Sequence, residues 1–315
     1  MDIEILLALQ NFRDGIGSIF ISFLNKMTFF GEMNTALVVL AIVYWCVNRK
    51  VGTYLLMGWN GNRLVNGLLK VTACVYRPWI RDARIQPYPP TKAAATGYSF
   101  PSGHAMTSAS LYGGGVVRKE VPMILRIALG LFVFLISFSR IFLGVHTPQD
   151  ILVGMCSGLL VMWLTDRLLK WLELHPEKDM TIFVAGVVLA VSLALYAGLK
   201  SYPVDYDEMG NLIVDGAKMA NDTFKAVGWV LAFLVGFILE RRHINFSTDI
   251  SLNQRLTRLV IGLLGFYAIN LVLEPLFKAW ISGPVGTTIC CFTEMFYIVY
   301  LFPLLFRYLD RKATV

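Results

Sequence analysis

Charged side chains are scarce in this sequence of 315 residues. Lys, Arg, Asp and Glu make up 16% of it and hydrophobic residues 56%, whereas soluble domains carry roughly a quarter charged residues. Several apolar stretches approach or reach the roughly 20 residues that cross a bilayer. They are residues 34–48, 121–139, 180–199, 226–239, 259–273 and 284–306. The shortage of charge excludes an ordinary soluble domain and predicts a multi-pass integral membrane protein.

Histidine and cysteine are also few, with four and five copies. The apolar stretches hold Cys46, Cys156, Cys290 and Cys291, and no cysteine forms a metal-type pair with another cysteine or a histidine. We therefore expect no disulfide framework. Two of the histidines, His175 and His243, fall in predicted cytoplasmic loops, so too few ligands remain for a two-metal hydrolase. We predict neither a metal site nor a cofactor.

The net charge of +7 comes from short basic clusters between the apolar stretches. Such clusters are typical of cytoplasmic loops, so they do not indicate a nucleic-acid partner. The clusters assigned to this side are Arg49–Lys50, Arg118–Lys119, Arg167 with Lys170, Arg241–Arg242, Arg255 with Arg258, and Arg307 with Arg311 and Lys312. The opposite, non-cytoplasmic side receives residues 71–102 and the turn 140–147. Basic residues on that side need an explanation other than topology.

Hydropathy and segment length together predict an all-α, polytopic transmembrane helical bundle with nine or ten spans. The N-terminal residues 3–30 are apolar but interrupted by polar side chains, so both a first span and an interfacial helix remain open. Residues 200–225 are hydrophilic and are expected to form a loop. The sequence contains no internal repeat and no soluble domain.

The turn at residues 139–150 carries two side chains four positions apart, His146 and Asp150. At this spacing the carboxylate can hold one imidazole nitrogen and leave the other as a nucleophile. A purely structural alternative also stays open. Thr147 is a good N-cap and Pro148 a good first helical residue, so Asp150 would complete a capping box.

A second motif, Pro101-Ser102-Gly103-His104, precedes a predicted helix at 103–117 that is rich in small residues. Its Ser102 hydroxyl and the amides near Gly103 would lie at a helix N-terminus, which favours an anion such as phosphate. His104 would then protonate the leaving oxygen. A satisfied structural histidine at the membrane boundary is the alternative.

The third motif places Lys70 and Arg77 seven residues apart, so they nearly share one face if the helix persists to Arg77. An ammonium and a guanidinium so placed can converge on one anion. Each of them alone is also explained by snorkelling towards lipid headgroups. With Arg140, however, three cations and two histidines share one predicted face of the membrane. Together they supply the charge, nucleophile and proton donor that phosphoryl transfer requires.

These three patterns, Lys-x6-Arg-Pro, Pro-Ser-Gly-His and Ser-Arg-x5-His-x3-Asp, resemble the signature motifs of the type 2 phosphatidic acid phosphatase superfamily. That family includes lipid phosphate phosphatases, undecaprenyl diphosphate phosphatases, glucose-6-phosphatase and the vanadium haloperoxidases. The resemblance implies a helical-bundle fold and a metal-free mechanism. Carried over by position, it implies that His146 is the nucleophile, Asp150 its partner and His104 the general acid. The phosphate cradle would consist of Lys70, Arg77, Ser102, Gly103 and Arg140.

The resemblance also suggests a division of the chain. Residues 34–170 would form a six-helix phosphatase core, and residues 1–33 an N-terminal interfacial or first transmembrane helix. Residues 171–315 would form an extension of about four transmembrane helices, whose role and oligomeric consequences the motifs do not supply.

We therefore expect an integral membrane enzyme of a bacterial cell membrane, with its active site on the non-cytoplasmic face. Its partners would be the bilayer and a lipid substrate. It would hydrolyse a phosphomonoester or diphosphate of that lipid through a phospho-histidine intermediate. Two other enzymes remain open: a soluble sugar-phosphate phosphatase similar to glucose-6-phosphatase, and a lipid phosphotransferase. An anion transporter is the non-enzymatic alternative, but an anion path does not require the pairing of His146 with Asp150.

Overall fold

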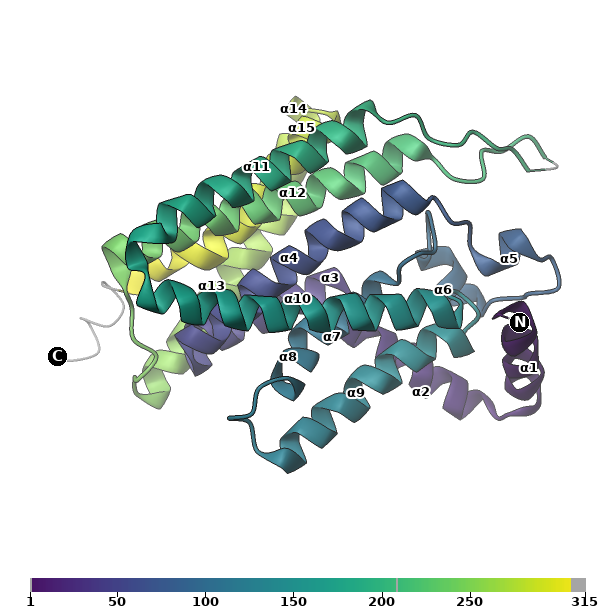
Figure 1. Ribbon diagram of the computed structural model, residues 1–315, viewed down its shortest axis with the longest axis horizontal. Coiled ribbons are helices and arrows are strands. Elements are labelled where there is room, and N and C mark those ends of the chain that lie inside the picture. The colour runs from purple at the N-terminus through teal and green to yellow at the C-terminus, as the bar shows by residue number, and fades with distance from the viewer. Residues whose placement is uncertain (1, 208, 307–315) are drawn as a thin grey trace. The chain divides into compact units, whose positions relative to one another are not determined.

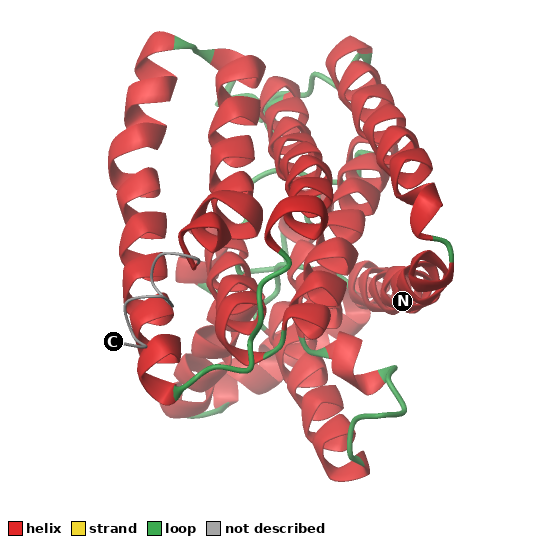
Figure 2. Ribbon diagram, turned by 90° about the vertical axis from the view of Figure 1, so that its left-hand side faces the viewer, coloured by secondary structure: helices red, strands yellow, loops and turns green. Residues whose placement is uncertain are grey.

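The computed structural model describes residues 2–207 and 209–306, which fall into two compact units. The first unit comprises residues 1–36, 65–164 and 200–219, and the second comprises 37–64, 165–199 and 220–315. Helices dominate both units, and the described residues contain no strand beyond one isolated bridge (Figure 2). The predicted all-α class is confirmed. The basic cluster expected at 307–312 lies outside the described residues.

The first unit is built around α9, which packs against α2, α7 and α8 (Figure 1). Two of its helices, α4 and α10, continue into the second unit. Its elements are α1 (Asp2–Gly15), α2 (Ser18–Thr28), the 3-10 turn η1 (Phe29–Gly31), the end of α4 (Arg49–Ala73), α5 (Pro78–Arg81), α6 (Pro89–Ala94), α7 (Gly103–Leu111), α8 (Gly113–Val116), α9 (Met123–Phe142) and the start of α10 (Pro148–Leu174).

Small residues let α7 lie against α10. A Cβ at Gly154 would stand 3.0 Å from the carbonyl oxygen of Ser102, and one at Gly158 would stand 2.7 Å from the Cβ of Ala109. The helices therefore approach each other at a distance that larger side chains would prevent. Instead of one helix over 103–117, the structure has α7 and the single-turn α8, which meet at Tyr112.

The second unit contains most of the long apolar helices. It consists of most of α3 (Met33–Ile42), η2 (Val43–Val47), the first part of α4, the end of α10, η3 (Pro176–Lys178), α11 (Asp179–Leu199), most of α12 (Gly216–Leu239), η4 (Glu240–Ile244), α13 (Leu252–Ala268), η5 (Ile269–Leu273), α14 (Glu274–Trp280), α15 (Gly283–Phe296) and η6 (Tyr297–Leu301). Within it, Trp45 Nε1 donates to the carbonyl of Ile298 at 2.8 Å, and Arg49 pairs with the buried Glu240 at 3.1 Å.

Six helical segments of the described chain are long and apolar enough to cross a membrane. They are 123–142, 148–174, 176–199, 216–244, 252–277 and 283–306, and the bent pair 18–31 and 33–47 would make a seventh. The expectation of nine or ten spans was larger because it also counted α4 and the segment 103–117. Four of the segments follow residue 174, as expected for the C-terminal extension.

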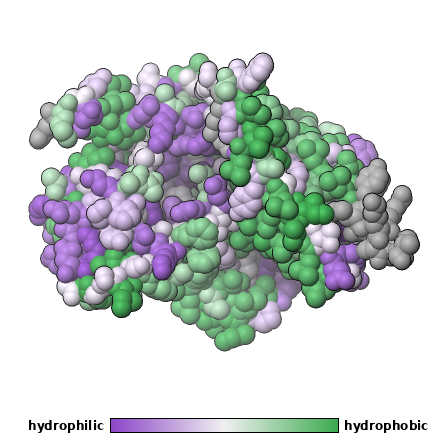
Figure 3. All heavy atoms as spheres, turned by 180° about the vertical axis from the view of Figure 1, so that it is seen from behind, coloured by the Kyte–Doolittle hydropathy of each residue, from purple (hydrophilic) through white to green (hydrophobic). Residues whose placement is uncertain are grey.

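Exposed apolar side chains are consistent with lipid around these helices. On α9, Ile124 is 77% exposed, and on α11 Leu189 is 64% exposed. Figure 3 shows hydrophobic residues spread over broad areas of the face that it draws. Apolar patches of this extent are unusual on soluble monomers, so they support a multi-pass membrane protein.

Candidate active site

His146 lies in the tight turn that joins α9 to α10. The carbonyl of Arg140 accepts the backbone amides of Val145 and His146 at 3.1 and 3.3 Å, which closes the turn after α9. Gly144 adopts a φ of +76°, and a Cβ there would stand 3.1 Å from the backbone of Pro87. A glycine is therefore needed at this position. The turn buries His146, which is 2% exposed.

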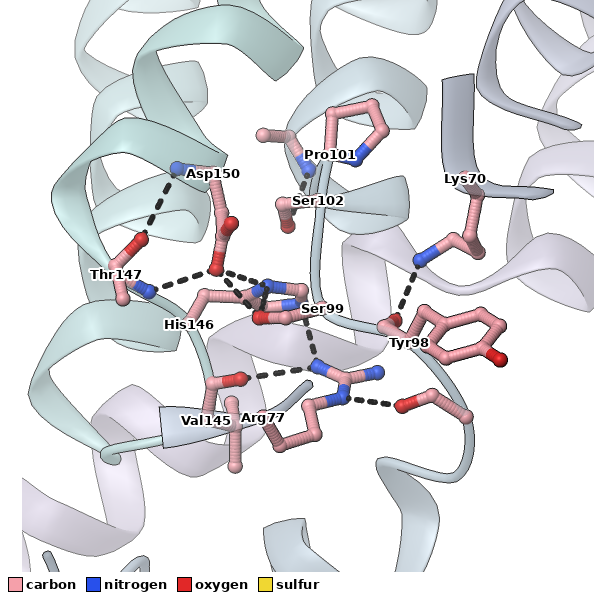
Figure 4. A network of polar contacts seen from close by, with 12 residues as sticks. Lys70, Arg77, Tyr98, Ser99, Pro101, Ser102, Val145, His146, Thr147 and Asp150 are labelled. Atoms are coloured by element: carbon pink, nitrogen blue, oxygen red, sulfur yellow. Dashed lines mark hydrogen bonds and ion pairs between the residues drawn. The ribbon is translucent and has the colours of Figure 1, made fainter. Parts of the chain in front are cut away.

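Asp150 holds one nitrogen of that imidazole. Its Oδ2 lies 3.2 Å from Nδ1 of His146 and accepts the Thr147 amide at 2.8 Å (Figure 4). The Asp150 amide in turn donates to the Thr147 hydroxyl at 3.3 Å, which gives the reciprocal bonds of a helix cap. Both sequence interpretations of Asp150 are thus present in one geometry. The cap fixes the carboxylate, and the fixed carboxylate orients His146.

Arg77 faces the other imidazole nitrogen. Its Nη1 lies 3.0 Å from Nε2 of His146 and donates to the carbonyl of Val145 at 2.9 Å. Its Nε donates to the carbonyl of Gly97 at 3.0 Å. Because a guanidinium only donates hydrogen bonds, Nε2 of His146 must accept and Nδ1 must carry the proton towards Asp150. This tautomer leaves the lone pair of His146 on the nitrogen beside the cation.

Ser99 belongs to the same network, although the sequence patterns did not identify it. Its hydroxyl donates to Oδ2 of Asp150 at 2.5 Å and lies 3.3 Å from Nδ1 of His146. Its amide donates to the carbonyl of Val75 at 2.7 Å, and its side chain is 1% exposed. Ser99 therefore contacts both members of the His146–Asp150 pair (Figure 4).

The Pro-Ser-Gly-His motif lies at the N-terminus of α7, as predicted. Ser102 is the N-cap, and its hydroxyl accepts the amide of Ala105 at 3.5 Å. Its own amide donates to the carbonyl of Asp150 at 3.0 Å, which ties this motif to the start of α10. Gly103 is the first residue of α7. Lys70, near the end of α4, donates to the carbonyl of Tyr98 at 2.9 Å, three residues before Pro101.

His104 packs against Gly31 of η1. A Cβ at Gly31 would stand 2.9 Å from Cδ2 and 3.1 Å from Cβ of His104, so only a glycine leaves the ring where it is. Burial lowers the pKa of His104 most, and the positive charges of Arg140, Arg77 and Lys70 lower it further. The same balance holds at His146, whose pKa is lowered by burial and then by Arg77.

Arg140 is a buried cation of the same unit, 3% exposed, in the last turn of α9. Its Nε has no hydrogen-bond partner among the residues that the structure describes. A buried donor without an acceptor is costly, and an anionic group would satisfy it. All eight residues that the sequence assigned to the site belong to the first unit: Lys70, Arg77, Ser102, Gly103, His104, Arg140, His146 and Asp150.

Arg13 of α1 is a further residue that the sequence patterns missed. Its guanidinium donates to the carbonyls of Phe142 and Gln86 at 3.3 and 2.5 Å, and it is 6% exposed. It thus bridges the end of α9 and the loop on which Gly144 packs.

His175 lies outside this site. It belongs to the second unit and stacks on Trp171, with ring centroids 4.8 Å apart.

The described residues contain no group of three or more His, Cys, Asp or Glu side chains that would hold a metal ion. The polar groups around His146 are instead one carboxylate, one hydroxyl and a guanidinium. A guanidinium can bind an anionic group, and a carboxylate and a hydroxyl can orient an imidazole.

Comparison with known proteins identifies relatives of both halves of the chain. The family described as "PAP2 superfamily" matches residues 35–173, and "PAP2 superfamily phosphatase, transmembrane extension" matches residues 224–313. Phosphatidylglycerophosphatase B of Bacillus subtilis (strain 168) is 31% identical over 121 residues, which are 36% of this chain and 55% of that protein. The match thus spans about half the length of this curated relative. No solved structure matches the chain. Since the two family matches together cover more than half of the sequence, the chain belongs to the PAP2 superfamily.

Proposed function

We propose that this protein is an integral membrane phosphatase that hydrolyses the phosphate ester or diphosphate of a membrane lipid. The observation that carries the proposal is the orientation of His146. Asp150 lies at Nδ1, 3.2 Å away, so Nε2 keeps its lone pair 3.0 Å from Arg77. A nucleophile beside a group that binds the phosphate oxygens is the arrangement that phosphoryl transfer requires.

In the proposed reaction, Nε2 of His146 attacks phosphorus, and the bond to the leaving oxygen breaks. The phosphate anion of the bound substrate offsets the positive charges of Lys70, Arg77 and Arg140 and so favours protonated His104. This imidazolium donates a proton to the leaving oxygen, and the phosphoryl group is held as a phospho-histidine. Water then attacks the phosphorus and releases inorganic phosphate, with His104 accepting the proton of the water. Asp150 stabilises the imidazolium character that develops on His146. Each step uses groups of this chain, so we expect hydrolysis to continue in EDTA.

The phosphate oxygens would be bound by Lys70, Arg77 and Arg140, with the amides at the start of α7. Negative charge that builds up on these oxygens in the transition state is stabilised best by donors that are already oriented. The buried Nε of Arg140 supports this role, because it has no acceptor within the described part of the protein. Burial of the site excludes water and strengthens these interactions.

A lipid substrate is supported by the membrane fold and by the printed name of the Bacillus subtilis relative, a phosphatidylglycerophosphatase. A site at the bilayer edge can reach a lipid headgroup without extracting its tails. The basic clusters in the loops that the sequence predicts to be cytoplasmic support a location of the site on the non-cytoplasmic face of a bacterial cell membrane.

The test is phosphate release by the purified protein in detergent. The substrates are phosphatidate, a phosphatidylglycerol phosphate, a polyprenyl diphosphate and glucose 6-phosphate, each measured with wild type, His146→Ala and His175→Ala. We expect lipid turnover that is lost in His146→Ala and kept in His175→Ala. Turnover of the sugar ester alone would contradict the lipid assignment. Transfer of the phosphoryl group to an added alcohol, with no free phosphate released when the alcohol is absent, would indicate a phosphotransferase.

A further inference from the structure

Residues 200–219 form a segment that neither family match covers, since those matches end at 173 and begin again at 224. In sequence the segment runs from the end of α11 into the first turn of α12. In the structure it nevertheless belongs to the first compact unit, together with residues 65–164. Its contacts therefore show how a segment outside both family matches meets the unit that contains the site.

Lys200 caps the C-terminus of α4. Its ammonium donates to the carbonyls of Val71 and Thr72, the latter at 3.3 Å, and lies 3.4 Å from Sγ of Cys74. The last carbonyls of a helix have no partner within the helix, and a cation there satisfies them and interacts favourably with the helix dipole. Cys74 leaves the helix with a φ of +48°, a left-handed conformation that is uncommon for a residue other than glycine.

The same segment holds the chain at the residue before Arg77. The hydroxyl of Tyr76 donates to Oδ2 of Asp205. Burial and the Asp205 carboxylate raise the pKa of Tyr76 to about 12, so the phenol stays protonated and remains a donor. Asp205 is thereby engaged by the tyrosine beside Arg77.

A third contact supports the carbonyl that Lys70 binds. The ring of Tyr98 is fully buried and packs with Val214 and Met219 of the segment. Met219 also fills the space beside Gly97, whose carbonyl accepts the Nε of Arg77 at 3.0 Å. Lys70 donates to the carbonyl of Tyr98, and Arg77 donates to that of Gly97. Side chains from residues 214–219 therefore pack against both residues that supply these acceptors.

We propose that four side chains of this segment, Lys200, Asp205, Val214 and Met219, position the active site. Lys200 fixes the end of α4 and so directs Lys70 and Arg77 towards the substrate phosphate. The inference rests on the proposed function for its substrate but makes its own claim about anion binding. Lys200 is a positioning residue, because its ammonium bonds to backbone carbonyls of α4.

The chain offers a matched control for this role. Lys218 lies in the same segment, is exposed, and its substitution removes the same charge. Lys200→Met, Lys200→Arg and Lys218→Met therefore separate the contact at the end of α4 from the general loss of a positive charge near the site. Arginine keeps a donor that reaches the same carbonyls.

Two measurements decide the matter. The first is KM and kcat for a short-chain lipid phosphate, and the second is the affinity for inorganic phosphate, measured by thermal shift in detergent. For Lys200→Met we expect KM to rise and phosphate affinity to fall by about tenfold, with kcat changed far less, because misplaced cations weaken ground-state and transition-state binding alike. Lys200→Arg should restore most of both values, and Lys218→Met should match wild type.

Equal phosphate affinity in Lys200→Met and wild type would overturn the inference, and so would an equal loss in Lys218→Met. A fall in kcat or in folded yield without a change in affinity would also contradict it. The phosphate-binding measurement does not depend on turnover. A wild type that binds phosphate but hydrolyses no lipid would therefore refute the proposed function while leaving this inference tested on its own.

Discussion

Oδ2 of Asp150 lies 3.2 Å from Nδ1 of His146 while it accepts the amide of Thr147 at 2.8 Å. One carboxylate oxygen thus caps a helix and orients an imidazole. The two roles separate in Asp150→Asn, because an asparagine still caps a helix well but no longer stabilises a charged imidazole. We predict that kcat falls about a thousandfold or more, while the melting temperature in detergent changes by only a few degrees.

Steady-state kinetics and thermal unfolding of the purified variant check this prediction. An Asp150→Asn protein that keeps wild-type kcat would show that Asp150 acts only as a cap. A protein that fails to fold would show that the cap depends on the charge.

Ser99 provides a second test, because its hydroxyl donates to Asp150 at 2.5 Å and lies beside His146. In Ser99→Ala one hydrogen bond to the carboxylate is lost. A hydrogen bond to a charged group contributes about 1.5 kcal/mol or more, so we expect kcat to fall about tenfold. Ser108→Ala is the control, since Ser108 is equally buried but donates to the carbonyl of Ala105. Equal rates in the two variants would exclude a role for Ser99.

Gly31 tests the placement of His104. A Cβ at Gly31 would stand 2.9 Å from Cδ2 of His104 and 3.0 Å from Cγ2 of Ile136, so alanine there must displace the His104 side chain together with that of Ile136. We predict that Gly31→Ala lowers kcat by about a hundredfold for a lipid ester, because a displacement of about 1 Å misplaces the proton donor. Gly17→Ala is the matched control, since nothing lies within 4 Å of the added Cβ.

A substrate with a good leaving group refines that test. The loss in Gly31→Ala should be smaller for p-nitrophenyl phosphate, because its leaving oxygen needs little protonation. An equal loss for both substrates would indicate that alanine at Gly31 disturbs more than the proton donor.

The pH dependence follows from the lowered pKa of His146. Burial and the charge of Arg77 disfavour the imidazolium, so Nε2 remains unprotonated below the ordinary histidine value of about 6.5. Protonation of Nε2 would block attack, and a lowered pKa moves that loss to more acidic pH. We predict that kcat/KM, divided by the fraction of substrate dianion, does not fall between pH 7 and about pH 5.5. A tenfold fall per pH unit below 6.5 would contradict it.

The sequence was enough to find the residues whose spacing is itself the signal. His146 and Asp150 are four positions apart, and Ser102 and His104 begin a helix. The expectation that Lys70 and Arg77 share a helix face was wrong, because α4 ends at Ala73 and Cys74 is left-handed. All of these lie in one compact unit. The all-α class and the membrane location could be predicted because both depend on the length of the apolar stretches, which is a property of the sequence and not of tertiary packing.

The sequence did not identify residues whose role depends on packing between distant segments. Ser99 meets Asp150 across 51 positions, and Arg13 meets Phe142 across 129. Gly31 matters only because His104 lies against it. Residues 200–225 were expected to be a loop, but α12 already begins at Gly216. The contacts of residues 200–219 with the end of α4 have no counterpart in hydropathy or motif spacing.

The central claim is that the phosphoryl group passes to His146, and trapping that intermediate tests it most directly. His104→Ala should still be phosphorylated by p-nitrophenyl phosphate, because this leaving group needs no proton, but it should lose the base that activates water. After quenching at alkaline pH, mass spectrometry of the peptide containing residue 146 should therefore show phosphate on His146. Continued turnover by His104→Ala with an unmodified His146 peptide would contradict the account.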